Sequence, residues 1–313
     1  MVDMNFLNRF AGPALLCAIR VIGCIPRAAG TRIGAVIGRL LYTFNKKHRT
    51  IASDNVSRAF GWHPTSKAVQ QIVRQVFNNL GSMLFEIAWA YRLDPKQHPQ
   101  YFRITGGEHY YRAMEKRRGA LLLTAHMGNW ELFTVIAHMA KIPANVVYRP
   151  LDSPALDDAV RQLRCRFGAK LIPTTNRRAI VQILNTLNKG ECVAMLMDQN
   201  VDYYNGVFVD YFGKRACTNK GMAVLALRTG APVVPVFMVR DAGGFRAEVL
   251  PEIPLSKTGD KQKDIETNTA RYNQAIEAFV RRYPDQWFWV HQRWKTRPYC
   301  TWPDESKRGR QRP

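Results

Sequence analysis

The feature of this 313-residue chain that most limits its possible folds is a regular alternation of short apolar runs with helix-patterned segments. Four runs have the length and composition of buried strands: 120–125, 144–148, 192–197 and 233–239. The segments with a helical pattern are 129–141, 153–167, 177–189 and 219–229. Strands that alternate with helices predict an α/β fold, with a largely parallel sheet flanked by helices. In such a sheet, functional groups gather beyond the carboxyl ends of the strands.

Positive charge dominates the composition. The chain has 46 Lys and Arg against 24 Asp and Glu, a formal net charge of +22, which predicts attraction to nucleic acid, anionic lipid or a phosphorylated substrate. Basic and apolar residues are interleaved over residues 1–50, as in a segment that lies in a membrane interface. The apolar stretch at 13–26 contains Arg20 and is shorter than the about 20 residues of a membrane span. An interfacial segment is therefore favoured, although an amphipathic helix packed on its own domain has the same pattern.

The rest of the chain shows no internal repeat and no long linker rich in Pro, Gly or Ser. Residues 67–92 have apolar side chains at helical spacing and are predicted to form one long amphipathic helix. We predict an N-terminal membrane-associating segment at 1–45, one large domain at 46–300 and a basic disordered tail at 301–313.

The six cysteines form no CxxC pair and no cluster with histidine, so the sequence predicts neither a metal site nor a disulfide framework. A reducing, cytosol-facing environment fits this pattern best. The sequence also lacks a GxSxG elbow, a GxxxxGK[ST] phosphate loop and a GxGxxG motif after a strand. Hydrolase, nucleotide-dependent transferase and dehydrogenase interpretations are weakened accordingly.

His126 is the strongest candidate for a catalytic group, because it follows a predicted buried strand and precedes a predicted helix. Glu131, five residues on, is expected to fold back to the imidazole, hold its tautomer and stabilise the imidazolium. Backbone amides at Gly128 and at the helix start are candidate donors to a phosphate or a developing oxyanion. A histidine near a glutamate can equally be an ordinary surface pair.

Basic side chains follow the second predicted strand. Arg149 comes directly after it, and Arg161 and Arg164 share one face of the next predicted helix, with Arg166 near its end. Guanidinium groups on that face would suit bidentate binding of phosphate, whereas a solvated charged face is the commoner outcome.

Asp198 directly follows the third predicted strand and is expected at the same sheet edge as His126. It is a candidate to hold a basic side chain or the acceptor. An aspartate at such a position can also cap a turn or a helix.

Five segments taken in order resemble the bacterial late acyltransferases of lipid A biosynthesis, the lauroyl/myristoyl acyltransferase family related to the HxxxxD glycerolipid acyltransferases. These segments are Ala125-His126-Met127-Gly128-Asn129-Trp130-Glu131, Tyr148-Arg149-Pro150, Met197-Asp198-Gln199, Tyr211-Phe212-Gly213-Lys214 with Thr218, and Val290-His291-Gln292-Arg293-Trp294-Lys295-Thr296-Arg297-Pro298. The resemblance implies a glycerolipid-acyltransferase-like fold in 46–300 and an acyl carrier protein thioester as donor. It further implies a hydroxyl of a lipid A precursor as acceptor, the cytoplasmic face of the inner membrane as location, and no metal or nucleotide cofactor.

The family's catalytic positions fall on His126, Glu131, Arg164 and Asp198 of this chain. The resemblance and the basic clusters together give the predicted substrate-binding residues: Arg149, Arg161, Gln199, Lys214, Arg293, Lys295 and Arg297. In the implied mechanism the histidine removes a proton from the acceptor hydroxyl, which attacks the thioester. Tyr211 and the Gln292-Arg293-Trp294 segment depart mildly from the family pattern, which affects acceptor or chain-length preference more than reaction class.

Three other interpretations stay open at this point. The nearest is an acyltransferase of the same fold that acts on another lipid, such as a lysophospholipid or a phosphatidylinositol mannoside. A second is a basic nucleic-acid-binding protein with tryptophans as stacking groups, although no such motif is present. A third is a non-catalytic lipid-binding protein that has kept the fold.

Overall fold

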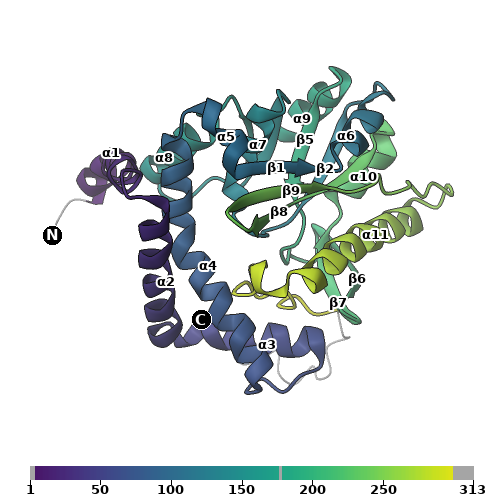
Figure 1. The fold of residues 1–313 in the computed structure, drawn as a ribbon. Helices are drawn as coiled ribbons and strands as arrows, with labels where there is room; N and C mark the ends of the chain where they lie inside the picture. Colours follow the sequence, from purple (N-terminus) through teal and green to yellow (C-terminus); the bar gives the residue numbers. More distant parts are fainter. Residues whose placement is uncertain (1–3, 176–177, 299–313) are drawn as a thin grey trace.

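A computed structural model describes residues 4–175 and 178–298 of the chain. Its centre is a seven-stranded sheet of order β1-β9-β8-β2-β5-β3-β4, in which every neighbouring pair is parallel except β8 and β9 (Figure 1). The strands are β1 (Phe102–Thr105), β2 (Ala120–Thr124), β3 (Ala144–Tyr148), β4 (Lys170–Pro173), β5 (Cys192–Leu196), β8 (Val233–Asp241) and β9 (Gly244–Val249). β6 (Gly206–Tyr211) and β7 (Lys214–Asn219) form a separate antiparallel hairpin.

Helices cover both faces of the sheet, as an α/β fold requires. One face packs against α9 (Ala179–Asn188), α10 (Gly221–Thr229) and α11 (Lys261–Arg282), whose apolar residues share one buried cluster with β2, β5 and β8. The other face packs against α6 (Gly107–Met114) and α7 (Phe133–Met139). The remaining helical elements are α1 (Met4–Ile22), α2 (Arg27–Phe44), α3 (Lys46–Phe60), α4 (Lys67–Arg92), α5 (His98–Tyr101) and α8 (Pro154–Cys165), with short 3-10 turns at Pro95–Gln97, Trp130–Leu132 and Pro284–Gln286.

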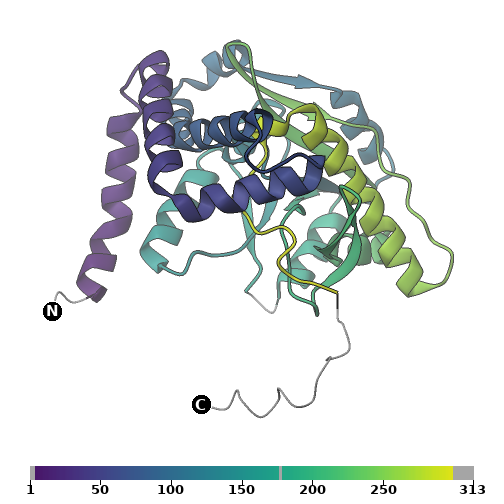
Figure 2. The same cartoon turned by 90° about the horizontal axis from the view of Figure 1, so that it is seen from below.

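The N-terminal segment forms α1 and α2, and α2 lies along α4 (Figure 1). Its glycines make this close approach possible, because a Cβ on Gly34 would lie 2.6 Å from the Cα of Ser82. Figure 2 shows α1 and α11 at opposite sides of the molecule. Within residues 4–175 and 178–298, no helix combines the length and the apolar character that a membrane span needs.

The predicted α/β fold is confirmed, with a largely parallel sheet flanked by helices. The long predicted helix at 67–92 is α4, and the four predicted strands are β2, β3, β5 and β8. The predicted helix at 129–141 is corrected to a 3-10 turn followed by the shorter α7. The predicted tail at 301–313 lies outside the described residues, and membrane contact of 1–45 stays a prediction.

Candidate active site

His126 and Asp198 meet because β2 and β5 are adjacent parallel strands. Their register pairs Thr124 with Leu196, the last residue of each strand, so the residues two positions further on lie opposite each other. The Nδ1 atom of His126 is 2.8 Å from Oδ1 of Asp198, and the backbone N–H of His126 donates to Oδ2 at 2.9 Å. The two groups are 72 residues apart in sequence and form one unit at the carboxyl edge of the sheet.

The surroundings of Asp198 keep its carboxylate ionised. Burial alone would raise its pKa, but the His126 charge, the two hydrogen bonds from His126 and a bond from Trp287 together lower the pKa to about 2. The indole Nε1 of Trp287 donates to Oδ2 at 2.7 Å. An ionised carboxylate can only accept, so the neutral ring of His126 carries its proton on Nδ1 and leaves Nε2 unprotonated.

Glu131 has a different partner. Its carboxylate accepts two hydrogen bonds from Arg164, at 2.8 Å from Nε and 2.6 Å from Nη2, in a bidentate pair. The predicted pairing of Glu131 with the His126 ring is therefore corrected, because the register of β2 and β5 gives the ring Asp198 instead. Glu131 and Arg164 keep about a fifth of their side-chain surface exposed, and both line the cavity beside His126.

The segment after His126 turns sharply and is tied to the C-terminal part of the chain. Gly128 has a φ of 57°, and a Cβ at this position would lie 2.5 Å from the carbonyl oxygen of Met238, so only glycine fits. The amide of Gly128 donates to the carbonyl of Gln286 at 2.9 Å. This amide is thus already bonded, which corrects the expectation that it is free for an oxyanion.

Asn129 anchors the same segment to α4. Its side chain donates to Glu86 at 2.9 Å, and Glu86 forms a bidentate ion pair with Arg240, with both nitrogen–oxygen distances 2.7 Å. Glu86 and Asn129 are buried. Such a network is strongly destabilised when one partner is removed, so it fixes the loop that carries His126.

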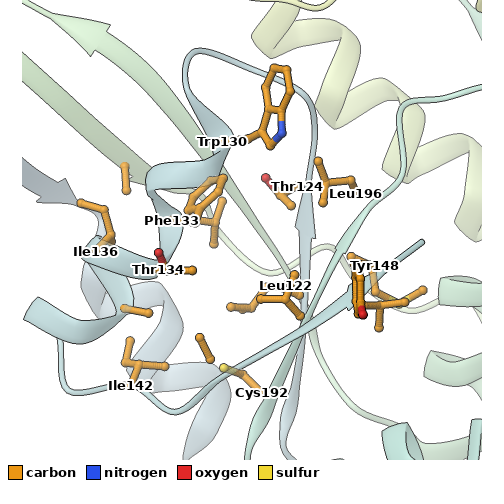
Figure 3. A pocket seen from close by; sticks show the side chains of 18 of the residues that line it. Leu122, Thr124, Trp130, Phe133, Thr134, Ile136, Ile142, Tyr148, Cys192 and Leu196 are labelled. Atoms are coloured by element: carbon orange, nitrogen blue, oxygen red, sulfur yellow. The ribbon is translucent and has the colours of Figure 1, made fainter. Parts of the chain in front are cut away.

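A deep cavity of about 450 Å³ opens beside His126 and runs between the sheet and the helices α6 and α7 (Figure 3). Its walls are mostly apolar side chains from β2, β3, β5, β8 and β9 on one side and α7 on the other. Leu122, Thr124 and His126 all face it because alternate residues of a strand point to the same side. Tyr110 and Cys192 lie on the cavity wall as well, and burial raises the pKa of Cys192 to about 11, which keeps it a neutral thiol.

Apart from Arg293, the predicted substrate-binding residues fall into two groups in the structure. Arg149 and Gln199 line the cavity, and the side-chain amide of Gln199 is 3.3 Å from Nε2 of His126. Four others are exposed and are not among the described residues that line the cavity: Arg161, Lys214, Lys295 and Arg297.

Arg293 is completely buried, which does not support its predicted contact with substrate. Its guanidinium donates to the carbonyl of Cys217 at 2.8 Å and to the hydroxyl of Thr218. Arg293 therefore fixes the β6–β7 hairpin against the C-terminal segment, and burial lowers its pKa.

Sequence reasoning did not predict two supports of the His126–Asp198 pair. Trp287 bonds Asp198 directly, and the ring of His291 accepts a hydrogen bond from the amide of Asn200 at 2.8 Å. His291 was noted as part of the C-terminal motif, but its contact depends on tertiary folding. Within residues 4–175 and 178–298, no group of three or more His, Cys, Asp or Glu side chains could hold a metal ion.

A histidine whose Nδ1 is paired with a buried aspartate, on the wall of a largely apolar cavity, is an arrangement that suits general acid–base chemistry beside an apolar ligand. The family model of the bacterial lipid A biosynthesis acyltransferases matches residues 5–296. The chain belongs to this family and is an acyltransferase, which confirms the resemblance found in the sequence.

Several characterised proteins are similar to this chain. A lipid A biosynthesis palmitoleoyltransferase of Escherichia coli K12 is 29% identical over 272 residues, which cover 86% of this chain and 84% of the relative. A lipid A biosynthesis lauroyltransferase of the same strain is 28% identical over 270 residues, 85% of each chain. A phosphatidylinositol mannoside acyltransferase of Mycolicibacterium smegmatis is 25% identical over 189 residues, 60% of each chain.

Proposed function

We propose that this enzyme transfers a fatty acyl chain from acyl carrier protein to a hydroxyl of a lipid A precursor, with His126 as general base. The observation that carries the proposal is the His126–Asp198 pair beside the apolar cavity, in a chain that matches the lipid A acyltransferase family over residues 5–296. The cavity would hold the acyl chain with its thioester end near His126.

The reaction proceeds by direct attack. Nε2 of His126 takes the proton of the acceptor hydroxyl as the hydroxyl oxygen forms a bond to the thioester carbon, and the carbonyl electron pair moves to its oxygen. Asp198 stabilises the resulting imidazolium through Nδ1. When the tetrahedral intermediate collapses, the carbon–sulfur bond breaks, and the carrier thiolate takes the proton from Nε2. No covalent acyl-enzyme is needed.

Glu131 and Arg164 are assigned to positioning the reactants at the cavity mouth. The ion pair raises the pKa of Arg164 despite a burial effect that acts to lower it, so the guanidinium stays charged. With Arg149 it gives the mouth a positive character that suits an acidic carrier protein and a phosphorylated lipid.

We also propose that the enzyme works on the cytoplasmic face of the inner membrane, held there by α2. Beside the glycines that pack on α4, α2 carries exposed apolar side chains, and Phe44 at its end is 78% exposed. The exposed apolar residues of this helix are Ile33, Val36, Ile37, Leu40, Leu41 and Phe44. Basic residues of the N-terminal segment flank them, which is the composition of a helix that lies in an anionic interface.

Co-sedimentation with phosphatidylglycerol vesicles tests this location. The double substitution of Leu40→Glu and Phe44→Glu should release the protein from the vesicles, because each carboxylate would have to leave water. Tyr204→Glu is the matched control, since Tyr204 is 85% exposed and lies on the loop before β6. Equal release by the control, or no release by the double variant, would rule out α2 as the anchor.

A second acceptor class is favoured by one observation. The chain is similar to phosphatidylinositol mannoside acyltransferases over 60% of its length, so a mannosylated phospholipid is the alternative substrate. The His126 chemistry would be unchanged, and the acceptor alone would differ.

The experiment that tests the proposed function is acyl transfer from acyl carrier protein to a tetra-acylated, Kdo-linked lipid A precursor in detergent micelles. Wild type should transfer, and His126→Ala should lose roughly 10³-fold or more in rate, because it deletes the base. The melting temperature of the variant controls for folding. Transfer only to a mannosylated phospholipid would move the proposal to the second acceptor, and wild-type turnover retained by His126→Ala would refute the assigned base.

A further inference from the structure

The wall of the cavity contains one buried hydroxyl that no described group satisfies. Thr124 is 4% exposed, its Oγ1 has no hydrogen-bond partner within residues 4–175 and 178–298, and its side chain lines the cavity. The other buried polar side-chain atoms without a partner in this part of the chain belong to residues that do not line the cavity. An unpaired buried hydroxyl is costly, so its presence in an apolar wall calls for a partner that arrives with the ligand.

Thr124 is a close neighbour of His126 on the cavity wall. The two residues are two positions apart at the end of β2, and their side chains face the same cavity. Figure 3 shows the Thr124 hydroxyl among the cavity-lining side chains, with Leu196, its partner in the neighbouring strand, beside it. An acyl chain that enters past His126 would bring its carbonyl oxygen, the first polar atom of the chain, to this hydroxyl.

Several other donors on the cavity wall near His126 have partners within the protein. Arg164 is held by Glu131, and the side chain of Gln199 lies 3.3 Å from Nε2 of His126. The hydroxyl of Thr134 bonds the carbonyl of Glu131 at 3.4 Å. The amide of Gly128, the donor that the sequence suggested, is bonded to Gln286. Among the buried side-chain N and O atoms of the described residues, Oγ1 of Thr124 is the one on this wall that has no partner.

We propose that the Thr124 hydroxyl donates a hydrogen bond to the carbonyl oxygen of the acyl thioester and to the oxyanion that replaces it. The inference rests on the proposed use of the cavity for an acyl chain, and it adds a catalytic donor to that reaction. When the acceptor oxygen bonds to the carbonyl carbon, the electron pair of the C=O bond moves to oxygen, and the negative charge forms on the atom that this hydroxyl would bond. A donor placed in advance in a dry site stabilises such a charge strongly.

Thr124→Val and Thr124→Ser separate the hydroxyl from the shape of the side chain. Thr124→Val keeps the branched shape and removes the donor, so kcat with acyl carrier protein thioester should fall about 10²-fold. Thr124→Ser keeps the donor and should retain most of the activity. Thr134→Val is the matched control, because it removes a second hydroxyl from the same cavity wall. The melting temperature of Thr124→Val should not fall, since the folded protein loses no internal hydrogen bond.

A binding experiment without turnover separates this inference from the proposed function. Titration calorimetry compares a lauroyl pantetheine thioester with the dodecyl pantetheine thioether, which has the same chain and no carbonyl. Wild type and Thr134→Val should prefer the thioester, and Thr124→Val should lose that preference. If Thr124→Val keeps the kcat of wild type and the same preference for the thioester, the role of Thr124 is overturned and the proposed acyl transfer still stands. A wild-type protein that binds neither compound and transfers no acyl chain would overturn both.

Discussion

Two carboxylates, Asp198 and Glu131, lie near His126 at the cavity, and their surroundings are very different. Asp198 is buried behind the ring and accepts hydrogen bonds from the ring, the backbone of His126 and the indole of Trp287. Glu131 lies in front, partly exposed, in a bidentate pair with Arg164. Glu131 is five residues from His126 and Asp198 is 72 away, yet the distant residue contacts the ring. The comparison teaches that strand register, more than sequence distance, selects the partner of a base at a sheet edge.

The largest effect expected on the Glu131 side comes from breaking its pair with Arg164. We expect Glu131→Ala and Arg164→Ala each to lower kcat/KM about 10²-fold, because either change leaves a charge unpaired at the cavity mouth and loses the placement of the reactants. The double variant should be no worse than the single ones, since the pair acts as a unit. A double-mutant cycle of transfer rates measures this.

Additive losses in that cycle would show that the two residues act separately.

A smaller effect on the His126–Asp198 pair is expected when the Trp287 indole, which donates to Asp198, is removed. Trp287→Phe deletes the hydrogen bond to Oδ2, which leaves more negative charge on Asp198 and strengthens the hydrogen bond from Nδ1 of His126 to Oδ1. The Nδ1 proton resonance of His126 should therefore move downfield in the NMR spectrum. Trp294→Phe is the control, because its indole N–H has no hydrogen-bond partner in the described part of the chain. Equal positions of this resonance in the two variants would show that Trp287 acts by packing alone.

The smallest effect is on stability and concerns His291, which braces the residue two positions after Asp198. Burial lowers the pKa of His291 from its ordinary 6.5 to about 4. Between these values the unfolded chain binds a proton that the folded protein excludes, so the free energy of unfolding should fall as pH drops from about 6.5 to about 4. Urea unfolding across this range should show a shallower slope for His291→Gln than for wild type. An unchanged slope would exclude His291 as the source of this pH dependence of the free energy of unfolding.

Much of the fold could be predicted because its central strands are continuous apolar runs. β2, β5 and β8 are largely buried on both faces and therefore stand out in sequence, as do the short apolar run of β3 and the amphipathic α4. β9 was missed because Arg246 and Glu248 interrupt its apolar pattern, and these charges are satisfied by an ion pair that forms only in the folded protein.

The candidate site could be predicted only in part. His126 and Asp198 were placed at one edge because both follow buried strands, but their contact depends on the register of β2 with β5, which the sequence does not state. The indole of Trp287 reaches Asp198 from a segment 89 residues away. Arg293 lies in the C-terminal motif at 290–298 and is buried. The motif therefore identifies a region but does not separate residues that bind substrate from residues that support the fold.

The measurement that tests the central claim most directly is the tautomer of His126, determined by NMR of ¹⁵N-histidine-labelled protein, with the resonance assigned by its loss in His126→Ala. Wild type and Glu131→Gln should both carry the proton on Nδ1, because Asp198 accepts it.

Asp198→Asn should switch the proton to Nε2 and abolish transfer. The amide oxygen of the asparagine has to take the position of Oδ2, where two N–H groups donate, which turns its NH₂ group toward Nδ1. A ring that keeps its Nδ1 proton in Asp198→Asn and loses it in Glu131→Gln would contradict the account and make Glu131 the orienting group.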